Sequence, residues 1–186
     1  MKLFREVTPV RTYTGIHKNY REYKDPLAKD FNYKCGYTDC SDSWFGGKNN
    51  FHIDHFIPWK KHETDKPHLK TDYSNLVYCC LYVNIAKSND EGLYLDPCNE
   101  DYNKHFQRED NGIIIPLTES AIYMYNKMKL YLERYHIIWL LDLIDNKMDK
   151  LQAIIEISDN NAAKEIYLKL SFAFNNYRKY LKKENE

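Results

Sequence analysis

Residues 49–62 read NNFHIDHFIPWKKH and place an aspartate, Asp54, directly before a histidine, His55. Apolar and polar residues alternate over residues 51–57, which predicts a β-strand whose two faces carry different side chains. One face would carry Phe51, Ile53 and His55, and the other His52, Asp54 and Phe56. Pro58 ends this strand, because proline has no backbone N–H to donate to a sheet.

Two further segments follow this strand along the chain. Residues 75–80, NLVYCC, open on Asn75 and read as a second short strand. Residues 81–88, LYVNIAKS, read as a short helix in which Asn84 and Lys87 lie one turn apart on the same face. A strand, a second strand and a helix in this order can bring polar side chains from all three elements to one point.

The motifs IDHFIPWKK, SNLVYCC and VNIAKSN together resemble the HNH endonucleases, also called ββα-metal or His-Me finger nucleases. The resemblance spans residues 52–88 and is nearest to the HNH domain of RNA-guided DNA nucleases. It implies that His55 is the general base and that Asn75 braces the loop and orients the base. It also implies that Asp54 and Asn84 bind one divalent cation, Mg²⁺ or Mn²⁺.

The chemistry of phosphodiester hydrolysis agrees with these roles. An imidazole, with an ordinary pKa of about 6.5, suits the removal of a proton from water near neutral pH. Carboxylate and amide oxygens suit Mg²⁺ or Mn²⁺. Because Asp54 and His55 point to opposite faces of a regular strand, the strand must bend there. Lys87 has two open roles, a contact to phosphate or a solvated side chain. His52 is either a third ligand or, the favoured reading, a packed strand histidine.

The five cysteines fit a structural zinc site only in part. Many HNH proteins hold zinc with two Cys-x-x-Cys pairs, and four thiolates in a tetrahedron are typical of such sites. Here four residues separate the upstream pair, and Val83 stands where the downstream pair would end. The zinc set would be Cys35, Cys40, Cys80 and Cys98. Buried free thiols are the favoured alternative.

The rest of the chain predicts an α+β protein, with a ββα-metal core preceded by short helices and followed by a helical extension. We expect a helix over residues 14–23, a second opened by Asp25-Pro26, a turn at Gly46-Gly47 and a strand within residues 112–116. Residues 119–157 predict a long helical tract with one break. The last helix would start near Ala162 and carry an apolar stripe, formed by Ile166, Leu170, Phe174, Tyr177 and Leu181.

These patterns divide the 186 residues into a nuclease unit over 1–117, with its core at about 30–90, and a helical extension over 118–186. The extension would pack on the core or dock a partner. Apolar runs long enough for a membrane span or a signal peptide are missing from the sequence, which predicts a cytoplasmic protein without membrane contact.

The formal net charge is zero, whereas strong non-specific nucleic-acid binders are usually basic. Positive charge for DNA would therefore be local, as in residues 1–34 with eight Lys and Arg against four Asp and Glu, or come from a partner. The predicted function is a metal-dependent DNA endonuclease. Residues 94–106 and the helical tail further resemble stand-alone HNH proteins of bacterial anti-phage systems, such as those of Septu and retrons, which implies an ATPase partner. The alternative is a catalytically silent HNH scaffold that binds nucleic acid or the ATPase.

Overall fold

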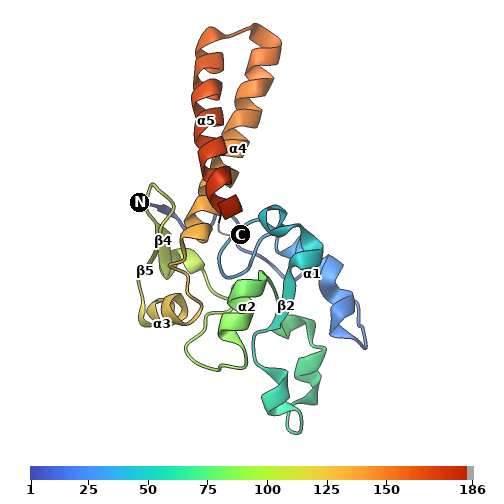
Figure 1. Cartoon of the computed structure of the whole chain (residues 1–186). Coiled ribbons are helices and arrows are strands. Elements are labelled where there is room, and N and C mark those ends of the chain that lie inside the picture. Colours follow the sequence, from blue (N-terminus) through green and yellow to red (C-terminus); the bar gives the residue numbers. More distant parts are fainter. Residues whose placement is uncertain (184–186) are drawn as a thin grey trace. The chain divides into compact units, whose positions relative to one another are not determined.

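The computed structural model describes residues 1–183, and it divides the chain into two compact units, residues 1–132 and residues 133–186 (Figure 1). The strands are β1 Lys2–Leu3, β2 His52–His55, β3 Leu76–Cys79, β4 Phe106–Arg108 and β5 Ile114–Pro116. The α-helices are α1 Lys24–Asp30, α2 Leu81–Lys87, α3 Glu119–Lys127, α4 Glu133–Ser158 and α5 Asn161–Lys183. Seven 3₁₀ turns link them: η1 Tyr20–Tyr23, η2 Asp42–Phe45, η3 Lys48–Asn50, η4 Trp59–His62, η5 Pro67–Lys70, η6 Tyr73–Asn75 and η7 Tyr102–Lys104. The class is therefore α+β, as expected from the sequence.

The strands of the first unit form two small antiparallel sheets. β2 pairs with β3, with Asp54 opposite Val77 and His55 opposite Leu76. β1, β4 and β5 form the second sheet, in that order. All four residues of β3 are buried, whereas β2 buries only Asp54. The expected strand over 51–57 is thus shorter than predicted, because the chain bends directly after His55.

The short helix α2 follows β3 after a single residue and packs against β2, as Figure 1 shows. The chain therefore contains the strand–strand–helix order that the sequence predicts over residues 52–88. α1 lies against β3 on the core side, where Leu27 and Ala28 are fully buried. The turn at Gly46-Gly47 is also confirmed, since both glycines have φ near +85°.

The predicted helix over residues 14–23 was wrong, because only Tyr20–Tyr23 is helical, as the 3₁₀ turn η1. Asn19 caps this turn with its side chain, which fixes the start there. Upstream, the backbone N–H of His17 donates to the Tyr23 hydroxyl instead of to a helical carbonyl. Local polar contacts thus replace the helix.

The helical tract breaks once, between α3 and α4, where Lys129 has a φ of 55°. The predicted boundary near residue 117 moves to Leu132, because α3 belongs to the first unit. Met124 of α3 is buried and its sulfur accepts the backbone N–H of Leu95, while Tyr123 donates to Asp90. These contacts tie α3 to the rest of the first unit.

The second unit is a hairpin of α4 and α5 (Figure 1). Its turn follows the predicted SDNN break, and the Asn160 side chain accepts from the Ala163 backbone N–H at the start of α5. Along the predicted α5 stripe, Ile166 is exposed and the other four residues are partly buried. No helix within residues 1–183 is long and apolar enough to cross a membrane.

Candidate active site

His55, at the end of β2, is held by a backbone carbonyl. Its Nε2 lies 3.0 Å from the Lys70 carbonyl oxygen. A carbonyl only accepts hydrogen bonds, so Nε2 carries the proton and Nδ1 keeps a lone pair. The centre of the imidazole ring also lies 4.7 Å from the centre of the Tyr20 ring, which it meets edge-on, and 6.2 Å from the ring centre of Trp59. The contacts give the imidazole a fixed tautomer and orientation.

The electrostatic surroundings of His55 favour its neutral form. Burial lowers its pKa below the ordinary value, and the nearby charges of Lys87 and Lys70 lower it further. The hydrogen bond to the Lys70 carbonyl acts in the opposite direction but does not cancel these effects. A neutral imidazole near pH 7 is the form that a general base requires.

Asn75, the last residue of η6, fastens both ends of the loop that carries the Lys70 carbonyl. Its Oδ1 accepts the Ile57 N–H at 2.8 Å, and its Nδ2 donates to the carbonyls of Ile57 and Leu69 at 2.9 and 3.0 Å. The residue is 4% exposed. Because Leu69 directly precedes Lys70, these bonds fix the carbonyl that orients the His55 imidazole.

Asp54, the third residue of β2, is buried and is 5% exposed. Its Oδ2 accepts from the Tyr37 hydroxyl at 2.7 Å, and Lys87 Nζ lies 3.0 Å from Oδ2 and 3.2 Å from Oδ1. Burial raises the pKa of Asp54, although the Lys87 charge and the hydrogen bonds from Tyr37 and Lys87 oppose this shift. Both carboxylate oxygens are therefore engaged.

Lys87, the last residue of α2, is 0% exposed. Besides the carboxylate of Asp54, its ammonium donates to the His55 carbonyl at 2.9 Å and lies 5.4 Å from the centre of the Tyr94 ring. The expectation of a solvated Lys87 is wrong for this reason. The other expected role, a contact to phosphate, also does not fit, because the ammonium is buried and its acceptors belong to the protein.

Asn84 meets His52 and not Asp54, because its Nδ2 lies 3.2 Å from His52 Nδ1. His52 and Asp54 share the face of β2 that looks toward α2, as the alternation of a strand requires. Burial lowers the pKa of His52, and the charge of Lys24 adds to this effect. His52 therefore packs beside α2, which agrees with its favoured reading as a strand histidine.

The cation that the resemblance implies would need open oxygens of Asp54 and Asn84. The structure instead places an ammonium and a hydroxyl on the Asp54 carboxylate and turns the amide nitrogen of Asn84 to His52. Within residues 1–183, no group of three or more His, Cys, Asp or Glu is arranged to hold a metal ion. As the side chains lie, the two expected ligands do not form a cation site.

The cysteines expected for zinc do not form a metal-binding group within the part of the chain that the structure describes. Cys35, Cys40 and Cys80 are buried and Cys98 is partly exposed. Cys35 contacts two of the others: its backbone N–H donates to the Cys40 carbonyl at 2.9 Å, and the Cys80 N–H donates to Cys35 Sγ at 3.5 Å. Burial alone would raise the pKa of Cys35, but hydrogen bonds from Cys80, Thr38 and the backbone lower it to about 6.

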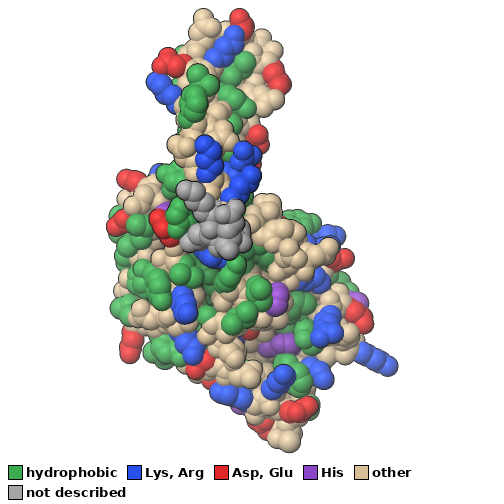
Figure 2. Space-filling model, in the orientation of Figure 1, with side chains coloured by type: hydrophobic (Ala, Val, Ile, Leu, Met, Phe, Trp, Pro, Cys, Tyr) green, Lys and Arg blue, Asp and Glu red, His purple; other side chains and the backbone are tan. Residues whose placement is uncertain are grey.

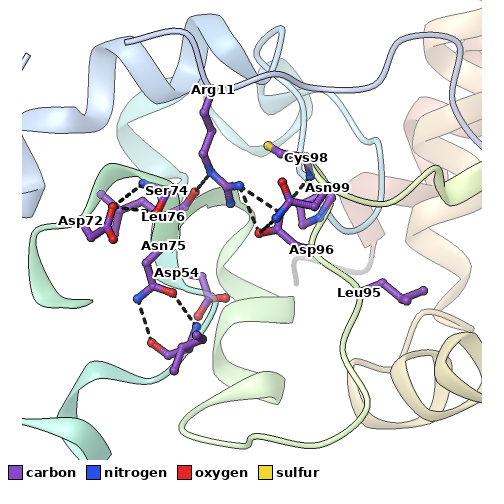
Figure 3. Close-up of polar contacts among 12 residues, drawn as sticks. Arg11, Asp54, Asp72, Ser74, Asn75, Leu76, Leu95, Asp96, Cys98 and Asn99 are labelled. Carbon is purple, nitrogen blue, oxygen red and sulfur yellow. Dashed lines mark hydrogen bonds and ion pairs between the residues drawn. The ribbon is translucent and has the colours of Figure 1, made fainter. Parts of the chain in front are cut away.

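Several groups that shape the site were not predicted from the sequence. Tyr37 and Tyr20 lie in a loop and a 3₁₀ turn outside the motifs, so no local signal marks them, and Trp59 lies within IDHFIPWKK but was given no role. Arg11 is a further example, because its Nε donates to the Leu76 carbonyl at 3.0 Å and its Nη1 pairs with Asp96 at 3.1 Å (Figure 3). Arg11 thereby fastens the N-terminal segment to the start of β3, directly after Asn75.

The loop over residues 58–70 places positive charge beside His55. It carries four lysines against one glutamate and one aspartate, and all four lysines are exposed. Lys70 Nζ lies 4.5 Å from the centre of the Trp59 ring. Figure 2 shows histidine side chains among lysine and arginine side chains on the visible face of the first unit. Local charge of this kind is present although the whole chain is neutral.

His62 in this loop pairs with Glu91 at 2.5 Å and with Asp65 at 3.3 Å. The hydrogen bond that His62 donates to Glu91, followed by the one that it donates to Asp65, raises the pKa of His62 above its ordinary value. The stability that this pairing contributes is fully present below the ordinary histidine pKa of about 6.5, and it is lost as pH rises through the raised pKa of His62. We expect an NMR titration to give His62 a pKa above about 6.5, and the Glu91→Gln variant to give it a lower pKa than the wild type. An unchanged midpoint in that variant would contradict the pairing.

A scan against protein-family models finds no match to this chain, and a search of curated proteins finds no similar sequence. The function of the protein is therefore inferred from its residues and their geometry.

Proposed function

We propose that this protein is an HNH-type endonuclease that hydrolyses phosphodiester bonds of DNA with His55 as the general base. One observation carries this proposal. The Nε2–H of His55 donates to the Lys70 carbonyl, and Asn75 fastens the loop to which this carbonyl belongs. The order of the elements also supports the proposal. β2, β3 and α2 follow one another as strand, strand and helix, which is the order in HNH nucleases.

In the proposed reaction, His55 Nδ1 takes a proton from the attacking water as the water oxygen bonds to phosphorus. The bond from phosphorus to the leaving oxygen breaks, and that oxygen takes a proton from solvent. The partly buried, neutral imidazole accepts this proton, and the Lys70 carbonyl stabilises the imidazolium through the Nε2–H hydrogen bond. Tyr20 and Trp59 limit the ring to one orientation. The exposed lysines of residues 58–70 supply charge for the phosphate backbone, whose contacts dominate the affinity of proteins for DNA.

A bound Mg²⁺ or Mn²⁺ would supply charge neutralisation at the scissile phosphate. The resemblance places it on Asp54 and Asn84, and both remain the proposed ligands. Because the structure closes Asp54 with Lys87 and Tyr37, we assign no step of the reaction to the cation.

The second unit supports the proposed partner, an ATPase subunit of an anti-phage system in the cytoplasm. Both α4 and α5 expose large apolar side chains, as protein-binding surfaces often do. These are Ile154 and Ile157 on α4, and Ile166, Leu168 and Phe172 on α5. This role for the helical hairpin is the docking role expected from the sequence.

The proposal is tested with purified protein on supercoiled plasmid DNA and on a single-stranded RNA of similar length. We expect nicking of the plasmid with Mg²⁺ or Mn²⁺ and none in EDTA, because a phosphodiester needs charge neutralisation to react. Reactions with the co-purified partner are run in parallel. DNA that stays intact under all these conditions would contradict a nuclease function.

The closed carboxylate favours a second candidate, the silent HNH scaffold, because a neutralised Asp54 has little affinity for a cation. A scaffold would bind DNA or the ATPase with the same affinity in EDTA and in Mn²⁺, and would leave both strands intact. A gel-shift series in the two conditions, run beside the cleavage assay, separates the two functions.

A further inference from the structure

Two aromatic rings contact the imidazole of His55 from separate parts of the chain. Tyr20 opens η1, and its ring centre lies 4.7 Å from that of His55. Trp59 opens η4, and its ring centre lies 6.2 Å from the imidazole. All three residues are partly exposed. The two rings therefore belong to the surface around the proposed general base and not to the buried core.

Each of these two rings has a cation beside it. Lys70 Nζ lies 4.5 Å from the centre of the Trp59 ring. The guanidinium carbon of Arg21 lies 5.9 Å from the centre of the Tyr20 ring. Both distances are within the range of cation–π contacts, about 6 Å, and both cations are exposed. Rings that only held the His55 imidazole would need no charge beside them, so the arrangement suits a ligand with flat rings and negative charge.

Further exposed lysines stand close to the two rings along the chain, at Lys18, Lys60 and Lys66. Aromatic side chains within a basic surface are typical of single-strand binding, because the cations hold the phosphates while the rings stack on the bases. The bases of a duplex are already stacked on one another. A duplex would therefore offer its phosphates to the lysines but no free base to the rings.

From this arrangement we infer that Tyr20 and Trp59 form a stacking site for unpaired bases of single-stranded DNA, next to the phosphodiester that His55 faces. Both rings contact one imidazole, so bases stacked on them would flank the scissile phosphate. Lys70 and Arg21 are exposed and can move from the rings to the phosphates as the bases stack. The inference rests on the proposed function, since it takes His55 as the base of a nuclease.

The first test uses the wild-type protein in EDTA, so that binding is measured apart from cleavage. Fluorescence anisotropy compares a labelled thymidine strand of about 12 nucleotides, within the usual range of single-strand sites, with an abasic strand of the same length. The abasic strand keeps every phosphate and lacks the bases. We expect the thymidine strand to bind at least about fivefold more tightly, the smaller contribution of one stacked base. Equal affinities, or no binding of either strand, would overturn the inference.

The second test compares variants on the thymidine strand and on a duplex of the same length. Trp59→Leu keeps an apolar side chain and removes the flat ring, so it should bind the strand at least about fivefold more weakly and the duplex almost unchanged. Trp59→Phe keeps a ring and should retain most of the affinity. Lys66→Gln removes a charge and should weaken strand and duplex alike.

Tyr131→Leu is the matched control, because Tyr131 is an exposed aromatic residue outside both 3₁₀ turns. It should bind both DNAs as the wild type does. A Trp59→Leu protein that binds the strand like this control, or that loses affinity for strand and duplex equally, would overturn the inference. Neither test uses cleavage. A protein that stacks bases and leaves DNA intact would contradict the nuclease proposal alone, whereas one that nicks plasmid without distinguishing the two strands would contradict the stacking site alone.

Discussion

His55→Ala should reduce the rate of plasmid nicking by roughly 10²- to 10⁴-fold, the usual contribution of a general base. The alanine removes the lone pair of Nδ1 and leaves water without a proton acceptor at this position. The folding cost should be small, because the imidazole is only partly buried and the single hydrogen bond of its ring goes to the Lys70 carbonyl. Initial rates at fixed Mn²⁺, together with thermal melts followed by circular dichroism, measure both quantities.

The matched control is His68→Ala, because His68 is an exposed histidine in η5 of the same loop. It should nick plasmid at close to the wild-type rate, since it removes a histidine and leaves the Lys70–His55 contact in place. A His55→Ala protein that cuts as fast as this control would show that His55 is not the base. The proposed DNA-binding role of the loop would then remain, but a residue other than His55 would have to act as the base.

The elements around the site were predictable because their signals are local. Alternating residues in FHIDHFI, the apolar run NLVYCC and the helical segment LYVNIAKS each predict one element without reference to the rest of the chain. β2, β3 and α2 lie within those ranges. The sequence predicts Asn75 as the first residue of the second strand, and the structure places it directly before β3, at the end of η6. Its place beside the loop was implied by the resemblance.

The contacts of Asp54 were not predictable, because they depend on tertiary packing. Tyr37 reaches Asp54 from a loop seventeen residues upstream, and Lys87 from the end of a helix thirty-three residues downstream. Neither pairing has a periodicity that a sequence would reveal. The motif specifies which residue types stand at the site, whereas the burial of Asp54 and Lys87 determines whether the carboxylate is open. The failed helix over residues 14–23 has a local origin instead, since the hydroxyl of Tyr23 accepts the His17 N–H from only six residues away.

Asn75→Asp should destabilise the protein by about 2–4 kcal/mol, because buried groups that lose their partners cost about 1–3 kcal/mol each. The aspartate can still accept the Ile57 N–H. It has no donor for the carbonyls of Ile57 and Leu69, and its charge would face both oxygens. The loop would then hold the Lys70 carbonyl less firmly, and the nicking rate should fall about 10-fold or more even where the variant is fully folded. Urea unfolding and nicking rates at low temperature measure the two effects separately.

Asn126→Asp is the control for this change, because Asn126 is exposed on α3 and a surface substitution of this kind usually stays within about 0.5 kcal/mol. The two variants carry the same chemical change, so a difference between them reports the environment of Asn75 and not the added charge. If folded Asn75→Asp nicked DNA at the rate of Asn126→Asp, the amide would serve stability alone. The orientation of His55 would then depend on Tyr20 and Trp59, whose rings contact the imidazole directly.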